Sequence, residues 1–352
     1  MESANEILNS KNVPEDKIIT FFKANLRPDY DHSKYHWQYF TSTKSQLFIS
    51  QNKDELICTQ GMIFYPLMFA GKFVNSAKSE SSFLLTDFRG KGYFEKLYAY
   101  AVNDCVENDI NVFWGFTALG EVWSKKLKFE VYDIFYESQY FLSKKIELIS
   151  YFKSNVPFKD KLRNLIKTLF NRNKKLNIDT LCTIEKRDLK QNEDLINWVN
   201  NQWFYENPNS VTLSNCYSFL IDRVAQNHSI NYTFQIISIN GAVCGYFILN
   251  HSNSKTTYLV DIVLLANALN VTVFQSIVEW IKINYDYERV SYLGNIQNIY
   301  NKSIFELFTP SKSRLSLLKD MQFVLKVTNK NSSFKNIDNF VLNGLWTEGF
   351  KI

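Results

Sequence analysis

The pattern of apolar and polar residues predicts alternating strands and helices in the first half of the chain. Residues 46–50 and 56–64 read as strands paired around a polar turn, and residues 67–74 are expected to extend the sheet with an interruption at Gly71. Residues 81–86 alternate into an apolar run, which is typical of a buried strand. Apolar positions then recur at helical spacing, so a helix is expected to begin at Gly92 or Tyr93: Phe94, Leu97, Tyr98, Ala101 and Cys105.

Further elements flank this unit on both sides. A strand at residues 111–117, a helix at 119–127 and a turn into a third strand near Phe129 follow it. Residues 14–25 predict an N-terminal helix, and the aromatic segment Trp37-Gln38-Tyr39 comes before the first strand. The first half therefore reads as a mixed α/β domain.

The second half repeats this order of elements. Residues 232–238 and 242–249 form an expected hairpin around Asn240-Gly241, a dipeptide typical of tight hairpin turns. A strand at 257–264, a helix at 271–283 and a strand at 290–293 follow. Between residues 263 and 271 there is no Gly, Arg or Lys. The second copy is thus expected to be degenerate.

A basic amphipathic segment at residues 158–170 separates the two copies. We expect an N-terminal domain at residues 1–150, a basic linker helix at 151–180 and a C-terminal domain at 181–352. A helix lying on a membrane surface is an alternative for the linker.

The composition excludes several classes of function. The 352 residues are enough for two domains, and 45% hydrophobic residues support large cores. A net charge of +5 is too diffuse to indicate nucleic-acid binding. With only four His, and no His/Cys/Asp/Glu cluster at metal-ligand spacing, no metal is expected.

Cysteine usage and hydropathy suggest a cytoplasmic location. The five cysteines are scattered and mostly lie in apolar segments, which favours free thiols in a reducing compartment. No apolar run is long enough to span a bilayer, and the polar, acidic start at residues 1–5 is unlike a signal peptide. The sequence leaves the oligomeric state open, a dimer included.

The turn Arg89-Gly90-Lys91-Gly92 carries the clearest chemical signal. Glycine tolerates the positive φ angles that a tight strand-to-helix turn often needs. The following helix presents free N–H groups and the positive end of its dipole, and Arg89 and Lys91 add charge. The turn is therefore suited to a pyrophosphate, although a basic surface turn is the alternative.

From residue 35 to residue 142 the chain resembles the GNAT superfamily of acyl-CoA-dependent N-acyltransferases. The order is strand, Arg-x-x-Gly turn, helix, strand, helix and Lys126-Leu127-x-Phe129 turn into a strand. Phe94 departs from the small residue usual at its position. The resemblance implies an α/β (α+β) fold of two tandem GNAT-like domains with mixed, mostly antiparallel sheets.

The resemblance also implies a coenzyme A site at the basic turn. The pyrophosphate would lie on the turn, and the pantetheine arm would run beside the strand that ends at Thr86, with Leu85 as its backbone partner. The implied cofactor contacts are Leu85, Thr86, Arg89, Gly90, Lys91, Gly92, Tyr93, Phe94, Thr117 and Trp123. Acyl-CoA is then the co-substrate.

The implied reaction is transfer of an acyl group from acyl-CoA to a primary amine. Tandem chains of this size with a Trp-x-Tyr segment are similar to bacterial enzymes that acylate nucleotide-linked aminosugars, for example a dTDP-amino-dideoxyhexose, for surface polysaccharides. Trp37 and Tyr39, with Trp346 in the C-terminal tail, are expected to contact the acceptor. Core packing is the alternative for these three aromatic residues.

The attacking amine needs a base, because an alkyl ammonium with a pKa near ~10 is almost fully protonated at pH 7. The candidates are His36, then Glu348 and Asp261. His36 needs no pKa shift to act near neutral pH, whereas Asp261 lies in an apolar strand where a carboxylate has a raised pKa. The position at which many GNAT enzymes carry an acidic Tyr holds Ser124 here.

Two other functions remain open. An inactive GNAT-derived binding module or scaffold would explain Ser124, whereas the intact turn at Arg89 argues for retained activity. An aminoacyl-tRNA-dependent transferase also uses tandem GNAT-like domains, and the mild net charge weighs against it.

Overall fold

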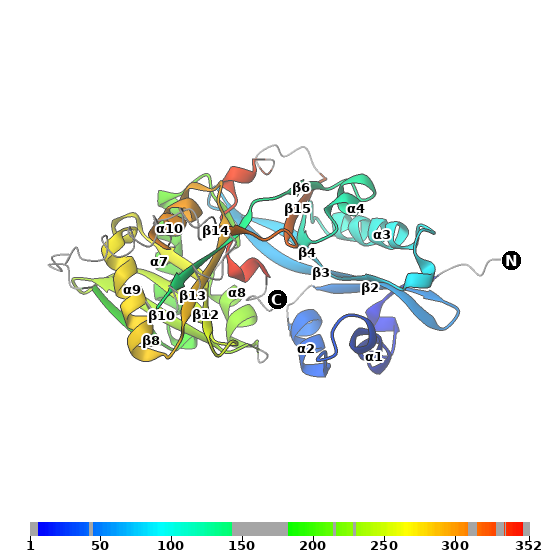
Figure 1. Cartoon of the computed structure of the whole chain (residues 1–352). Coiled ribbons are helices and arrows are strands. Elements are labelled where there is room, and N and C mark those ends of the chain that lie inside the picture. Colours follow the sequence, from blue (N-terminus) through cyan, green and yellow to red (C-terminus); the bar gives the residue numbers. More distant parts are fainter. Residues whose placement is uncertain are drawn as a thin grey trace, which may run out of the picture.

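The computed structural model describes residues 6–41, 45–142, 182–213, 216–227, 230–308, 315–328, 334 and 336–347. Within these residues two mixed sheets form the centres of two lobes (Figure 1). The predicted linker helix at 151–180 lies outside the described residues, and the predicted domain limits stay a prediction. No helix among the described residues is long and apolar enough to cross a membrane.

The first sheet contains most strands of the N-terminal half. Its order is β1-β2-β3-β4-β5-β15-β6, and β9 pairs with β3 beside this path. The strands are β1 (Glu6–Asn9), β2 (Gln46–Asn52), β3 (Glu55–Phe69), β4 (Lys72–Leu84), β5 (Val112–Thr117), β6 (Glu130–Tyr132), β9 (Val211–Leu213) and β15 (Gln322–Val327).

The second sheet has the order β14-β7-β13-β12-β11-β10-β8. Its strands are β7 (Phe135–Phe141), β8 (Cys182–Arg187), β10 (Tyr232–Ile239), β11 (Ala242–Asn250), β12 (Thr256–Leu264), β13 (Arg289–Asn295) and β14 (Leu315–Leu317).

The two halves of the chain exchange strands. β7 follows β6 in sequence, yet it pairs with β13 and β14 in the second sheet. β15 comes from the end of the chain, yet it lies between β5 and β6 in the first sheet. Each sheet is therefore completed by the other half of the chain.

Helices cover both faces of the first sheet. α3 (Tyr93–Glu107) packs on β2, β3 and β4, with α4 (Gly120–Lys125) beside it. α1 (Glu15–Asn25) and α2 (His32–His36) lie on the opposite face (Figure 1). The buried face of α3 consists of Leu97, Tyr98, Ala101, Val102 and Cys105, which confirms the predicted helical pattern.

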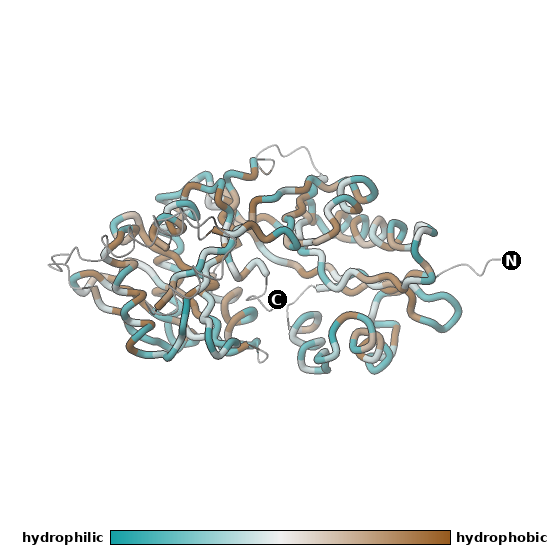
Figure 2. The backbone as a smooth tube through the Cα atoms, in the orientation of Figure 1, coloured by the Kyte–Doolittle hydropathy of each residue, from teal (hydrophilic) through white to brown (hydrophobic). Residues whose placement is uncertain are grey.

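The second sheet is covered mainly by α7 (Glu193–Glu206) and α9 (Val271–Asn284). α7 packs on β11 and β12, and α9 packs on β8. α8 (Tyr217–Leu220) and α10 (Ile299–Phe308) complete the described α-helices. Hydrophobic segments follow the strands of both lobes (Figure 2).

The sequence predicted the turns of two hairpins correctly and the turn of a third hairpin incompletely. Asn240 (φ 51°) and Gly241 (φ 82°) form the predicted turn between β10 and β11, and Lys53 (φ 51°) lies in the turn between β2 and β3. Residues 67–74 do not continue one strand. Ala70 (φ 49°) and Gly71 (φ 71°) close a hairpin between β3 and β4, because two successive positive φ angles reverse the chain.

Candidate functional site

β4 and β5 pair only at one end and then separate. They are parallel, and their register is Ser76 to Val112, Ala77 to Phe113 and Lys78 to Trp114. β4 continues to Leu84 and β5 to Thr117 without further pairing between them. Beyond Lys78, the β5-facing edge of β4 is therefore open to a ligand that bonds like a strand.

A β-bulge lies in β4 within this open stretch. Glu80 pairs with Gly61 and Phe83 pairs with Thr59, so two residues of β4 oppose one residue of β3. Ser81 has a positive φ of 50°, which a side-chain-bearing residue adopts only when its surroundings hold it there.

Three side-chain hydrogen bonds hold the bulge. Thr59 Oγ1 donates to the Ser81 carbonyl at 2.8 Å, and Ser82 Oγ donates to Gln60 Oε1 at 2.6 Å. Tyr39, a predicted acceptor residue, donates its hydroxyl to Ser81 Oγ at 2.9 Å. Tyr39 thus connects the segment after α2 to the bulge.

The turn from β4 to α3 leaves the start of the helix uncapped. A short 3₁₀ turn, η3 (Thr86–Phe88), leads into Gly90 and Gly92, whose φ angles are 76° and 78°. Gly92 is the N-cap residue and provides no side-chain bond to the helix. Added Cβ atoms at Gly90 and Gly92 would meet nothing within 4 Å, so the space above the turn is free.

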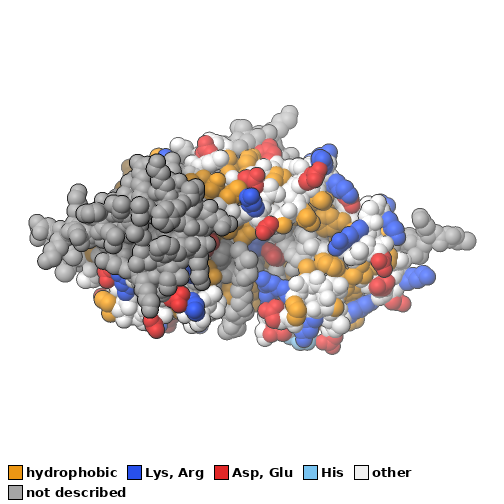
Figure 3. Space-filling view, viewed as in Figure 1, with side chains coloured by type: hydrophobic (Ala, Val, Ile, Leu, Met, Phe, Trp, Pro, Cys, Tyr) orange, Lys and Arg blue, Asp and Glu red, His pale blue; other side chains and the backbone are white. Residues whose placement is uncertain are grey.

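The basic side chains of the turn are held by backbone carbonyls. Arg89 Nε donates to the Leu84 carbonyl at 3.4 Å, and Lys91 Nζ donates to the Asp87 carbonyl at 3.0 Å. Figure 3 shows Lys and Arg side chains beside Asp and Glu side chains on this lobe. The positive charge at the turn therefore comes from Arg89, Lys91 and the start of α3, with Asp87 and Glu95 close by in sequence.

A cavity of about 840 Å³ connects the turn, the open edge of β4 and α1–α2. Of the predicted cofactor residues, five line it: Arg89, Gly90, Phe94, Thr117 and Trp123. The others belong to the turn and do not line the cavity, and their role stays a prediction: Leu85, Thr86, Lys91, Gly92 and Tyr93. The Leu85 N–H donates to the Ile57 carbonyl at 2.9 Å, so its one backbone donor is in use.

The predicted acceptor aromatics are buried around this cavity. Trp37 Nε1 donates to the Asp222 carbonyl at 2.9 Å, which links the two halves of the chain. Trp346 is fully buried, and its ring centroid is 4.6 Å from that of Trp114. Neither Trp37 nor Trp346 lines the cavity, whereas their neighbours Gln38 and Thr347 do.

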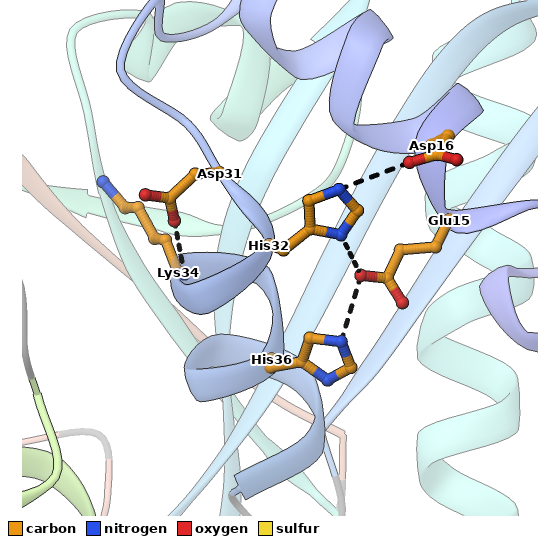
Figure 4. Close-up of polar contacts among 6 residues, drawn as sticks. All are labelled: Glu15, Asp16, Asp31, His32, Lys34 and His36. Atoms are coloured by element: carbon orange, nitrogen blue, oxygen red, sulfur yellow. Dashed lines mark hydrogen bonds and ion pairs between the residues drawn. The ribbon is translucent and has the colours of Figure 1, made fainter.

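Two of the three candidate bases, His36 and Asp261, lie apart from the cavity. His36 Nε2 is 3.0 Å from Glu15 Oε1, and His32 Nδ1 is 2.6 Å from the same oxygen (Figure 4). This cluster joins α1 to α2 on an exposed surface, and His36 does not line the cavity. Glu348 lies outside the described residues.

Asp261 is enclosed in the second lobe. Asn343 Nδ2 donates to Asp261 Oδ1 at 2.6 Å, and burial raises the pKa of Asp261 to about 7. Asp261 borders a separate cavity of about 20 Å³, which is close to the volume of one water molecule. The predicted pKa rise is confirmed, and a role as base stays a prediction.

Sequence reasoning missed the charged pair in the cavity wall. Lys78 Nζ is 2.6 Å from Glu80 Oε2, and both residues line the cavity. Glu95, the other carboxylate in the lining, pairs with Lys126 at 2.9 Å, and this contact lowers the pKa of Glu95. The alternation Lys78-Ser79-Glu80-Ser81 is the sequence signal for this ion pair, since residues two apart in a strand share a face of the sheet.

Ser124 does not take the place of an acidic Tyr in the cavity. Its Oγ donates to the Glu121 carbonyl at 3.2 Å within α4, and Ser124 is not among the lining residues. The described metal-ligating side chains form no group of three or more that could hold a metal ion.

Two mixed sheets, each with a parallel strand pair that separates along its length, give the architecture of two tandem GNAT-like domains. No protein-family model matches the sequence, and a search of curated proteins gives no significant match. Solved structures are similar in fold. A probable N-acyltransferase from Enterococcus faecalis V583 has a TM-score of 0.62 at 12% identity, over 93% of this chain and 73% of its own.

Two further solved structures are similar in fold. A tandem GNAT protein from the clavulanic acid biosynthesis pathway has a TM-score of 0.54 at 10% identity, over 93% of this chain and 100% of its own. N-myristoyltransferase from Saccharomyces cerevisiae with bound myristoyl-CoA has a TM-score of 0.53 at 12% identity, over 93% and 83% of the two chains. At these identities the similarity establishes the fold.

Proposed function

We propose that the protein transfers an acyl group from acyl-CoA to the primary amine of a small acceptor. One observation carries the proposal: the open edge of β4, the 840 Å³ cavity and the uncapped start of α3 adjoin one another. The tandem GNAT-like fold supports it, as does the presence of an acyl-CoA in the structurally similar yeast N-myristoyltransferase.

The pyrophosphate of coenzyme A is placed on residues 89–94. The free N–H groups at the start of α3 and the positive end of its dipole favour an anion there, and Arg89 lines the same cavity. The pantetheine arm is placed along residues 79–84 of β4, where its amides replace the missing strand. Thr117 and Trp123 form the opposite wall.

Glu80 is the base that the cavity supports best. Its carboxylate lies in the wall beside the bulge and is about one-third exposed, and Lys78 holds it in position. A positioned base contributes roughly 10²–10⁴-fold to the rate. His36 is held by Glu15 away from the cavity, and Asp261 is enclosed by the tail, so Glu80 precedes both as a candidate.

A nucleotide-linked aminosugar is the acceptor we propose. The segment from the end of α1 through α2 to η2 (Trp37–Thr41) contributes polar residues to the cavity lining, namely Arg27, Tyr30, Lys34 and Gln38. Charged and amide groups suit a hydrophilic acceptor that carries phosphate and hydroxyl groups.

Calorimetry with coenzyme A tests the donor site. One coenzyme A per chain is expected. Absence of binding would reject the enzyme and favour the scaffold alternative. Acyl transfer from acetyl-CoA to a panel of nucleotide-linked aminosugars, followed by mass spectrometry, tests the acceptor. Glu80→Gln should lower kcat without changing the affinity for coenzyme A.

A further inference from the structure

Arg223 is a buried cation whose charge is felt by the neighbouring Asp222 carboxylate but whose two Nη groups have no hydrogen-bond partner among the described residues. It lies in the π-helical turn η5 (Ile221–Ala225) and is 7% exposed. Neither Nη1 nor Nη2 has a hydrogen-bond partner. A guanidinium removed from water and left unpaired is strongly unfavourable, so a group that satisfies it belongs to the functional state of the protein.

Two aromatic rings hold the guanidinium between the lobes. The Cζ atom of Arg223 is 4.6 Å from the ring centroid of Tyr65, on β3, and 5.3 Å from that of Trp37. Cation–π attraction offsets only part of the desolvation cost and leaves the N–H groups unused. The two rings therefore orient the guanidinium but do not satisfy its N–H groups as an anion would.

The surrounding backbone is also unusual. Trp37 begins the π-helical turn η2 (Trp37–Thr41), and Arg223 lies in η5, so two such turns from opposite halves of the chain meet here. Turns of this kind are rare and are frequently found at functional sites.

Arg223 does not itself line the cavity, and neighbours on one sheet face connect it to the cavity wall. Tyr65 pairs with Ser76, and Lys78 lies two residues further along β4 on the same face. Lys78 lines the cavity, as does Gln38, which follows Trp37.

We infer that Arg223 binds an oxyanion of the acceptor, a carboxylate or a phosphate, through its two free Nη groups. The planar guanidinium matches both anions in a bidentate manner. This inference rests on the proposed function for the acceptor and adds the requirement that the acceptor is an anion. Both Nη groups are covered, so the inference requires a covering side chain to move as the anion enters; the Trp37 ring is held there by one side-chain hydrogen bond.

The separation between Arg223 and the proposed base Glu80 also sets the length of the acceptor. Arg223 lies over the ring of Tyr65, and Tyr65 pairs with Ser76 on β4. Ser76 and Glu80 are four residues apart on this strand, which corresponds to about 13 Å. An α-amino acid acylated at its α-amine is too short, because one carbon separates its two charged groups. An amine several bonds from its anion fits, as in a sugar linked to a nucleoside diphosphate or in a short peptide.

Thermal unfolding without acyl-CoA tests the anion site independently of catalysis. Sodium phosphate should raise the Tm of the wild type by about 2 °C or more over sodium chloride of equal ionic strength. Arg223→Met should lose this rise and have an unchanged or higher Tm in chloride, since it removes an unpaired buried charge. Arg187→Met, at an exposed arginine paired with Glu185, is the matched control and should keep the rise.

Matched acceptors then distinguish carboxylate from phosphate. One pair is a short peptide and its C-terminal amide, and the other is a nucleoside-diphosphate-linked aminosugar and the free aminosugar. The wild type should prefer the anionic member of one pair by about tenfold to a hundredfold in kcat/KM. Arg223→Met should abolish the preference, and Arg223→Lys should restore part of it.

Two outcomes would overturn the inference. One is a wild-type Tm that does not respond to phosphate or acetate, combined with a lower Tm for Arg223→Met, because this result indicates a purely structural cation–π contact. The other is equal use of the anionic and neutral acceptors. Failure of coenzyme A binding would instead overturn the proposed function and leave the Tm measurements interpretable.

Discussion

The junction between β4 and α3 in the first lobe and the junction between β12 and α9 in the second lobe share one plan and differ in a few residues. β4 leads through η3, Arg89, Gly90, Lys91 and Gly92 into α3. β12 leads through the 3₁₀ turn η6 (Ala266–Ala268) and only two residues, Leu269 and Asn270, into α9. At the second junction Asn270 Oδ1 accepts from the Val273 N–H at 3.1 Å, so the helix start is occupied by its own cap.

The parallel strand pairs β4/β5 and β12/β13 also differ in whether the opening between their separated ends is occupied. β12 and β13 pair from Thr256 to Leu259 and then separate, as β4 and β5 do. The C-terminal segment, residues 336–347, lies against both strands beyond that point. Asn343 donates to Asp261 on β12, and Asn295 on β13 donates to the carbonyls of Ile337 and Phe340 at 2.9 and 3.0 Å.

The comparison shows that the fold supplies an opening in each lobe and that local residues decide its use. In the first lobe the opening remains a cavity of about 840 Å³. In the second lobe the chain's own tail fills it, and Gly344 lies so close to β12 that a Cβ there would be 2.8 Å from Val260 Cα. In the first lobe, the uncapped start of α3 and the unpaired edge of β4 occur together and border the same cavity.

The largest expected effect is at the first junction. Gly92→Asp places a carboxylate at the start of α3, and repulsion of several kcal/mol should lower the affinity for coenzyme A about a thousandfold. Isothermal titration calorimetry measures this loss. Gly241→Asp is the matched control, because Gly241 has a similar φ of 82° in a remote hairpin and nothing within 4 Å of its added Cβ. Equal affinity for Gly92→Asp and wild type would refute the assignment.

The second expected effect concerns the filled opening. The pKa of Asp261 is about 7 in the folded state against ~3.9 in the unfolded chain. The folded state therefore holds the extra proton between these values, and the contribution of Asp261 to stability falls as pH rises from about 4 to about 7. Asp261→Asn should become more stable than wild type across this window, by up to about 4 kcal/mol at pH 8.

Urea unfolding at pH 5 and pH 8 measures this difference. A stability difference between Asp261→Asn and wild type that stays constant with pH would contradict the assignment of a buried, titrating carboxyl. Acyl transfer by Asp261→Asn also decides between a structural role and a role as base, since a base would be lost with the carboxylate.

A smaller effect is expected from crowding the tail. Gly344→Ala should destabilise the protein by about 1–3 kcal/mol, because its Cβ meets the backbone of β12. Gly90→Ala, which meets open space, should cost only the strain of its positive φ, about 1 kcal/mol. Denaturant midpoints compare the two variants, and an equal loss in both would mean that the tail does not fill the second opening tightly.

The smallest effect is at the cap of α9. Asn270→Ala removes the bond to the Val273 N–H and should cost about 1 kcal/mol, whereas Asn270→Gly should cost a few tenths. Neither variant should bind a second coenzyme A, because the second junction keeps its tail and lacks Arg and Lys. A stoichiometry of two for Asn270→Gly would show that the cap alone blocks the second junction.

Elements set by local chemistry could be predicted from the sequence. The Asn240-Gly241 turn and the helix beginning at Tyr93 follow from positive φ angles and apolar spacing within a few residues. The full length of β4 could not be predicted: the sequence indicates strands at residues 67–74 and 81–86 and none between them, because the bulge at Ser81 shifts the alternation. Glu80 was overlooked for the same reason.

Features that depend on distant pairing could not be predicted. The exchange of β7 and β15 joins residues more than 140 positions apart. The helical period of about 3.6 residues and the alternation of strands do not specify which strands pair. The anchoring of His36 by Glu15 and the meeting of Trp37 with Arg223 likewise depend on packing between elements.

The exchange of strands has a consequence for how the protein is made. β5 and β6 emerge from the ribosome roughly 200 residues before β15, which belongs between them. Until then the first sheet carries two unpaired edges, and such edges are prone to pairing with other chains. The first lobe therefore cannot be completed until β15 has been made, and a chain cut after β14 leaves that lobe unfinished.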